Sequence, residues 1–71
     1  MAEYLPGTTG ERITELREGA GLTIEELAVK IGVNATTLGR MEKGQTQKIG
    51  DDVLTALARE FHVSTDFLLG L

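Results

Sequence analysis

The chain has 71 residues, 41% of them hydrophobic, no cysteine and a formal net charge of −4 at pH 7. A chain this short forms one domain with one small core, and without cysteine it has neither disulfides nor thiolate metal ligands. The first ten residues contain no basic segment and no apolar run, which excludes a secretory signal, and no later run is long enough to span a membrane. We therefore expect a soluble, cytoplasmic protein.

The first predicted helix covers about residues 9–19. Thr8 and Glu11 have the spacing of a capping box, in which each side chain bonds to the backbone N–H of the other residue. The apolar face of this helix is made by Ile13, Leu16 and Ala20. We expect Gly19 and Gly21 to end the helix, because glycine readily adopts the left-handed backbone found after a last turn.

A second helix is predicted over about residues 24–31, followed by a turn at Gly32. Thr23 and Glu26 form another capping box at its start. Gly32 suits the left-handed backbone that turns the chain. Because Ala28 and Gly32 are small, we also expect the next helix to cross closely over this one.

A third helix is predicted over about residues 35–43. Asn34 is a good N-cap, and Gly44 ends the helix. The apolar positions of this helix and the one before it are Leu27, Ala28, Ile31, Val33, Leu38 and Met41. Such a pair of short helices has the spacing of a helix-turn-helix, in which the second helix is presented to the DNA major groove.

Two further helices follow a polar loop, at about residues 51–61 and 65–69. Asp51 and Asp52 lie in the first turn of the former, where acids favour the helix dipole, and Ser64 caps the latter. The apolar face of the longer helix is made by Leu54, Leu57, Ala58 and Phe61, and the chain end carries Phe67, Leu68 and Leu71. We expect the apolar chain end to fold back onto the first and fourth helices; the alternative is that the sequence is the N-terminal part of a longer protein.

No alternating β pattern and no internal repeat interrupts these helices. The sequence therefore predicts an all-α fold, a compact five-helix bundle that contains a helix-turn-helix and forms a single domain over residues 1–71.

The charge is unevenly distributed along the chain. Residues 33–50 hold three basic residues and one acidic residue, whereas residues 1–32 and 51–71 each have a net charge of −3. The only net-basic block is thus the predicted third helix with the loop after it. This polarity would orient that helix toward DNA, although three cations in such a stretch are equally compatible with an ordinary surface.

With one helix before the motif and two after it, the chain resembles the DNA-binding domain of the lambda Cro and repressor superfamily, often called XRE-type regulators. The matching stretches are ERITELREGAGLTIEELAVKIGVNATTLGRMEKG and LTALAREFHVSTDFLLGL, so the resemblance covers roughly Gly10 to Leu71. It implies a five-helix domain that binds operator DNA, usually as a homodimer on a two-fold-related site, with the third helix in the major groove.

By this resemblance, the third helix contacts DNA through Asn34, Thr36, Thr37 and Arg40. The residue types suit the task, because Asn pairs with adenine, Arg pairs with guanine, and Thr bonds a base edge or touches a thymine methyl. Backbone amides at the start of the second helix, with the Thr23 hydroxyl, would bind phosphate. The polar and basic edge suited to the adjacent DNA backbone consists of Lys43, Gln45, Thr46, Gln47 and Lys48.

The chain departs from the family pattern in the motif itself. Ile24 stands where family members commonly have a glutamine that contacts phosphate, and Ala35 and Gly39 are small for the outward face of a recognition helix. Gly39 either permits a close approach of the helix backbone to DNA or indicates that the helix reads few bases. Glu42 would repel phosphate, so we expect it to pair with Arg17 or Arg12 instead.

These features predict sequence-specific binding of double-stranded DNA by a transcriptional regulator, with repression by occupancy of an operator. Whether the homodimer forms before binding or only on DNA is left open. A single histidine and the lack of a glycine-rich phosphate loop argue against an enzyme, and no cofactor, metal or small-molecule ligand is predicted. The alternative is a protein-interaction module on the same scaffold, such as an antitoxin or a regulator subunit, with Ile24, Ala35 and Gly39 as its docking surface.

Overall fold

The computed structural model describes residues 6–45 and 49–70, and within them the chain forms five helices and no strand. The helices are α1 (Pro6–Gly19), α2 (Ile24–Ile31), α3 (Ala35–Glu42), α4 (Asp51–Phe61) and α5 (Thr65–Leu69). The predicted all-α fold is confirmed, and the predicted bounds of α2, α4 and α5 agree with the structure. None of the described helices is both long and apolar enough to cross a membrane.

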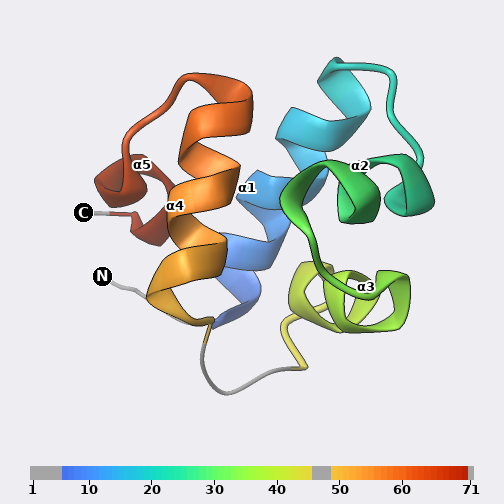
Figure 1. The fold of residues 1–71 in the computed structure, drawn as a ribbon. Helices are drawn as coiled ribbons and strands as arrows, with labels where there is room; N and C mark the ends of the chain where they lie inside the picture. Colours follow the sequence, from blue (N-terminus) through green and yellow to red (C-terminus); the bar gives the residue numbers. More distant parts are fainter. Residues whose placement is uncertain (1–5, 46–48, 71) are drawn as a thin grey trace.

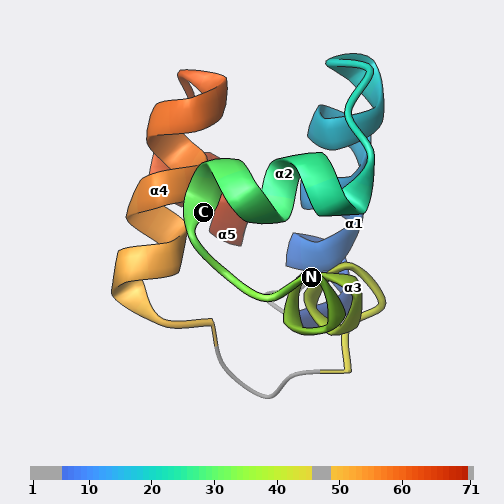
Figure 2. The same ribbon diagram turned by 45° about the vertical axis from the view of Figure 1, so that its right-hand side comes forward.

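The five helices surround one core (Figures 1 and 2). Helix α1 packs against α3 and α5, and α4 packs against α2 and α5. In Figure 2, α2 runs across the molecule between α1 and α4, with α3 below it. The two helices of the motif are therefore held from both sides, α2 by α4 and α3 by α1.

Each helix contributes one fully buried aliphatic side chain to this core. These side chains are Ile13, Leu27, Leu38, Leu57 and Leu68, each with 0% exposure. Leu68 brings α5 back onto α1 and α4, which confirms the expectation for the described part of the chain end. Leu71, also expected to help close the core, lies outside the described residues.

Helix α1 begins earlier than the sequence pattern indicates. It begins at Pro6, so Thr8 lies inside the first turn and is not the N-cap that the capping-box spacing predicts. Proline suits a first helical position because its fixed φ is helical and its missing N–H would have no partner there. Helix α3 ends at Glu42, one residue before the predicted end.

The remaining predicted helix ends are confirmed where the structure describes them. The Thr23 hydroxyl accepts a hydrogen bond from the Glu26 N–H at 3.1 Å, and the Glu26 carboxylate accepts one from the Thr23 N–H at 2.9 Å. The turn after α2 places Gly32 at φ 75°, and the turn after α3 places Gly44 at φ 72°.

The prediction that Gly32 allows a close helix crossing is wrong. A Cβ added at Gly32 meets nothing within 4 Å, so glycine is needed there for the left-handed backbone alone. The close crossing lies instead at Gly10 in α1, where a Cβ would approach Glu42 O of α3 to 2.6 Å and Met41 O more closely still.

The end of α3 is also joined to α1 by a buried ion pair. Arg17 donates to both carboxylate oxygens of Glu42, from Nε at 2.7 Å and from Nη2 at 3.1 Å, and its Nη1 donates to Leu22 O at 2.9 Å. Thr14 Oγ1 lies 3.1 Å from Glu42 Oε1. The hydrogen bond to Glu42 raises the pKa of Arg17 above its ordinary value. The expected pairing of Glu42 with α1 is confirmed, with Arg17 as the partner.

We expect Glu42→Ala to lower the free energy of unfolding by about 3–5 kcal/mol, because it leaves the Arg17 charge buried without its partner. The side chains of Arg17 and Glu42 are only 13% and 6% exposed. The matched control is Glu60→Ala, which breaks the partly exposed Lys30–Glu60 pair at 3.8 Å and should cost about 0–1 kcal/mol. Urea unfolding followed by circular dichroism measures both, and equal losses would contradict the structural role of Glu42.

Candidate nucleic-acid interface

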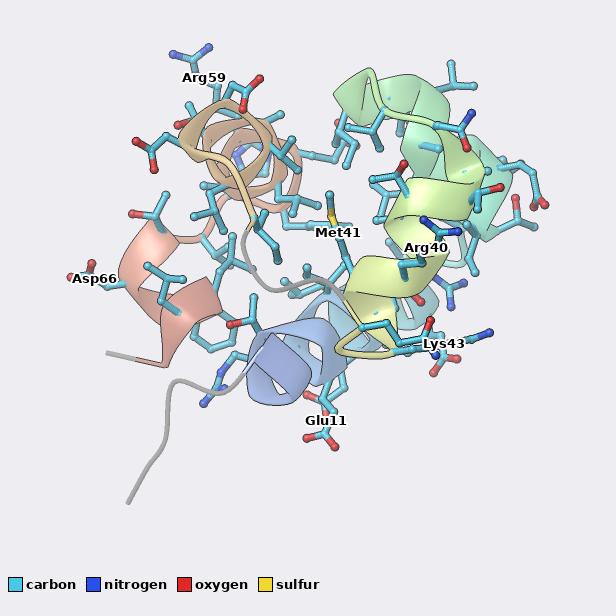
Figure 3. All side chains as sticks on the ribbon, turned by 90° about the horizontal axis from the view of Figure 1, so that it is seen from below. Glu11, Arg40, Met41, Lys43, Arg59 and Asp66 are labelled. Carbon is cyan, nitrogen blue, oxygen red and sulfur yellow. The ribbon has the colours of Figure 1, made fainter. Side chains whose placement is uncertain are left out.

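Helix α3 has one face in the core and the opposite face in solvent. Leu38 and Met41 are buried, whereas Thr36, Thr37 and Arg40 are exposed. Figure 3 shows Met41 directed toward the interior, Arg40 over the outer side of α3 and Lys43 extending away from the molecule. The structure thus brings together, on one exposed surface, the described polar and basic residues that the sequence assigns to the third helix.

Asn34 begins α3 and already uses one of its side-chain atoms. Its Oδ1 accepts a hydrogen bond from the Thr36 N–H at 2.7 Å, which confirms it as the N-cap. Pairing with adenine at two positions needs both Oδ1 and Nδ2 of an asparagine. Because an amide oxygen has two lone pairs, Asn34 can hold its cap through one of them and still donate from Nδ2, while the cap restricts how the amide can turn toward a base.

The start of α2 offers fewer free donors than a bare helix N-terminus. The capping box engages the N–H groups of Thr23 and Glu26, which leaves the amides of Ile24 and Glu25 as unpaired donors of the first turn among the described hydrogen bonds. The Thr23 hydroxyl is exposed and still has a proton to donate. Glu25 and Glu26 are exposed at the same end, and their charges reduce its attraction for phosphate.

The basic edge beside α3 is described in part. Lys43 and Gln45 are exposed, while Thr46, Gln47 and Lys48 lie outside the described residues. Among the ion pairs between described residues, none involves Arg40 or Lys43. Within the described part of the chain, both cations therefore remain available to a phosphate or a base.

Two of the three residues that depart from the family pattern have a structural explanation. Ile24 and Ala35 are half-buried and pack against the core, so they brace the two helices from within. Gly39 has no such explanation. An added Cβ there would meet nothing within 4 Å, so packing does not require glycine at this position. The packing of Ile24 and Ala35 gives no support to a docking surface made of these three residues.

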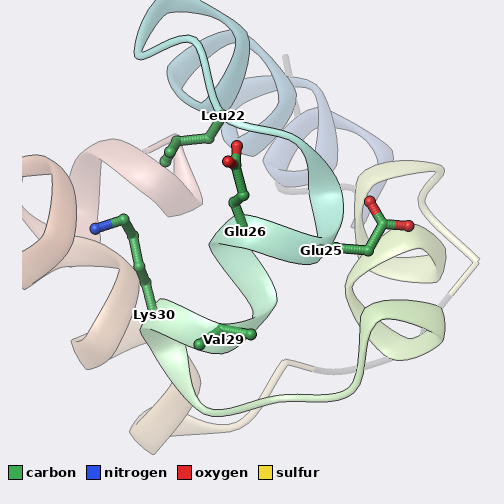
Figure 4. A pocket seen from close by; sticks show the side chains of 5 residues that line it. All are labelled: Leu22, Glu25, Glu26, Val29 and Lys30. Carbon is green, nitrogen blue, oxygen red and sulfur yellow. The ribbon is translucent and has the colours of Figure 1, made fainter.

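The surface has shallow grooves, and the largest of those described has about 480 Å³ of space (Figure 4). It is open to solvent and lined by Leu22, Glu25, Glu26, Val29 and Lys30. No group of three or more potential metal ligands occurs in the part of the chain that the structure describes.

A family model for the helix-turn-helix matches residues 13–68. The chain belongs to this helix-turn-helix family. Among curated relatives, it is 41% identical to the uncharacterized HTH-type transcriptional regulator YobD of Bacillus subtilis (strain 168) and 36% identical to the HTH-type transcriptional regulator ImmR of the same organism. Each match covers 86% of this chain, and 54% of YobD and 47% of ImmR, so the chain spans about half the length of these relatives.

Solved structures of this family share the fold. The restriction-modification controller protein C.AhdI from Aeromonas hydrophila superposes with a TM-score of 0.80 at 28% identity, covering 89% of this chain and 94% of C.AhdI. SinR, the master regulator for biofilm formation, superposes in its complex with DNA with a TM-score of 0.80 at 30% identity, covering 86% of this chain and 97% of the SinR chain. The resemblance inferred from the sequence is confirmed.

We expect Asn34→Ala to lower the free energy of unfolding by about 1 kcal/mol, because the Thr36 N–H loses its acceptor. Asn34→Ser should leave stability nearly unchanged, since a serine hydroxyl caps as well as an asparagine. In a domain of this size the alanine variant should melt roughly 4–8 °C lower in a thermal scan. Equal melting temperatures for the two variants would show that the cap contributes nothing.

Proposed function

We propose that this helix-turn-helix domain binds double-stranded DNA sequence-specifically as part of a transcriptional regulator, with α3 in the major groove. The observation that carries the proposal is the exposed surface of α3, where Thr36, Thr37 and Arg40 are open to solvent while Leu38 and Met41 are buried. The SinR–DNA complex supports it, since that relative has the same fold and is solved with DNA.

The residues divide into readers and positioning contacts. Arg40 reads a guanine through its two-pronged guanidinium, and Thr36 and Thr37 contact neighbouring base edges or thymine methyls. Asn34 donates from Nδ2 while its Oδ1 keeps the cap. The phosphate contacts come from Thr23, Lys43 and Gln45 in the described residues, and from Thr46, Gln47 and Lys48 beyond them.

The charge distribution sets how tightly one copy binds. Arg40 and Lys43 face the proposed DNA, whereas Glu25 and Glu26 stand at the α2 N-terminus. Few phosphate contacts give modest affinity for a single copy and a shallow dependence on salt. We therefore propose a homodimer that places two α3 helices about one helical turn, ~34 Å, apart on an operator. Occupancy of that operator makes the regulator a repressor, acting in the cytoplasm where the DNA is, with no catalytic step.

Selection of bound sequences from a pool of random duplexes tests the function directly, because it needs no knowledge of the operator. We expect the selected duplexes to share a motif with two-fold symmetry, and the domain to bind them more tightly than a scrambled duplex. A pool that converges on no motif, at low and at moderate salt, would refute sequence-specific binding.

For the selected duplex, we expect Arg40→Ala to weaken binding by roughly 5- to 150-fold, the range for loss of one good base contact. The matched control is Arg59→Ala, which removes the same charge from α4 on the opposite side of the molecule in Figure 3. Fluorescence anisotropy with the selected and the scrambled duplex measures both variants. If Arg59→Ala weakens binding to the selected duplex as much as Arg40→Ala, Arg40 acts only through net charge.

The homodimer predicts a stoichiometry of two chains for each full operator. We expect a duplex that retains one half-site to bind more weakly, because the second copy no longer adds its contacts. Inserting about half a helical turn (~5 base pairs) between the half-sites should remove the same gain by turning them to opposite faces. Sedimentation of labelled duplexes with the protein measures the stoichiometry, and one chain on a full operator at saturation would refute the dimer.

A further inference from the structure

The C-terminal end of α3 rests directly on the backbone of α1. At Gly10, a Cβ would lie 2.6 Å from Glu42 O and 2.9 Å from Glu42 C, and nearer still to Met41 O. All three are backbone atoms, which cannot turn aside as a flexible side chain can. An added carbon at Gly19 or Gly39, two other helical glycines, meets nothing within 4 Å. Glycine at this position therefore sets how closely α3 approaches α1.

Thr14 lies one turn after Gly10 on the same side of α1 and contacts the same end of α3. Its Oγ1 lies 3.0 Å from Gly10 O and 3.1 Å from Glu42 Oε1. A hydroxyl has one proton, so it donates to one of these two acceptors at a time. Either way, the side chain occupies the space between the Gly10 turn and the Glu42 carboxylate and fixes their separation.

The two exposed cations at the end of α3, Arg40 in the helix and Lys43 just after it, lie next to these contacts in the chain. Arg40 precedes Met41, and Lys43 follows Glu42. The other end of the helix is joined to α2 by a short turn, in which Val33 packs against the core, and α3 also packs against α2. A shift of several tenths of an ångström at Met41 and Glu42 would therefore tilt α3 about its N-terminal end and move Arg40 and Lys43 relative to the start of α2.

We propose that Gly10 and Thr14 are positioning residues for base recognition, which set the tilt of α3 against α1. Neither residue touches DNA in this role. The inference rests on the proposed DNA-binding function, and it extends that function to residues of α1 outside the helix-turn-helix. Base reading depends on the orientation of hydrogen-bonding groups, whereas non-specific binding depends on charge. Tilting α3 therefore affects the two kinds of binding unequally.

Gly10→Ala in the full chain tests the proposal, with Gly19→Ala as the matched control. Gly19 also lies in α1, and a Cβ there meets nothing within 4 Å. We expect Gly10→Ala to reduce the ratio of selected-duplex to scrambled-duplex affinity by roughly tenfold or more, the effect of one misplaced base contact, with little change in scrambled-duplex affinity. Gly19→Ala should leave the ratio unchanged. A folded Gly10→Ala protein with the wild-type ratio would overturn the proposal.

Thr14 supplies a second test that applies even if Gly10→Ala does not fold. Thr14→Val keeps the shape but removes the hydroxyl, and Thr14→Ser keeps the hydroxyl. We expect the valine variant to lose part of the affinity ratio and the serine variant to retain it. Equal ratios for the two variants, or a loss in the serine variant alone, would overturn the role of the Thr14 hydroxyl, because a purely steric role depends on the shape that only valine keeps.

Failure of the proposed function would leave a distinct signature. If the wild-type chain prefers no duplex, the proposed function fails, but the position of α3 can still be tested on the free protein. The test compares the amide NMR spectra of Gly10→Ala and Gly19→Ala. Shifts of the Arg40 to Gly44 amides in the first variant alone support the tilt. If Gly10→Ala does not fold, the same amides in Thr14→Val and Thr14→Ser decide the matter. Unchanged amides overturn the tilt whatever the chain binds.

Discussion

The hydrogen-bonded pair of Arg17 and Glu42 is the interaction on which the orientation of α3 depends. It joins the last turn of α1 to the last turn of α3 through two hydrogen bonds, and a third ties Arg17 to the carbonyl of Leu22 ahead of α2. One guanidinium thus connects α1, the turn between α1 and α2, and the end of α3. Because both charged groups are largely removed from water, each is tolerated only in the presence of the other. A small core could not enforce this arrangement by packing alone, since apolar contacts have little directional preference.

The core of the protein has little redundancy. One fully buried aliphatic side chain from each helix meets the others at the centre, so every helix depends on the remaining four for its burial. Short helices such as α2 and α5 are not stable in isolation and gain their stability from this packing. The polar caps at Thr23, Asn34 and Ser64 add direction, because each fixes where a helix begins. The core therefore stabilises the bundle as a whole, and the caps define where these three helices begin.

Local patterns along the chain predict most of the fold. The bounds of α2 to α5 are predicted to within one residue. They follow from the capping box at Thr23, the cap at Asn34 and the spacing of the leucines, and the residues that form each of these patterns are close in sequence. The start of α1 is predicted less well, since Thr8 has the spacing of a cap but the helix begins at Pro6. Choosing between these two starts needs the conformation of the chain before the helix, which spacing does not encode.

The candidate site is predictable in part for the same reason. The exposure of Thr36 and Arg40 follows from helical periodicity once Leu38 and Met41 are placed in the core. Thr37 precedes Met41 by one turn, so periodicity alone would not predict that it is exposed. The engagement of the Asn34 amide oxygen follows from its position as a cap. The contact of Gly10 with α3 joins residues about thirty positions apart, and a glycine in a helix gives no sequence signal of what lies against it. The spacing of Gly10, Thr14 and Arg17 on one side of α1 is the only hint that the sequence offers.

The division of α3 into an inner and an outer face has a consequence for how such a domain diversifies. The groups that hold the helix in place are Leu38 and Met41, which lie in the core shared by all five helices, and Glu42, which bonds to Thr14 and Arg17 of α1. Among the described contacts, no side-chain hydrogen bond or ion pair joins Thr36, Thr37 or Arg40 to another helix. Single substitutions can therefore replace the outer residues one at a time, and each intermediate sequence still folds. Asn34 is the exception, because changing it alters the start of the helix and its surface chemistry in one step.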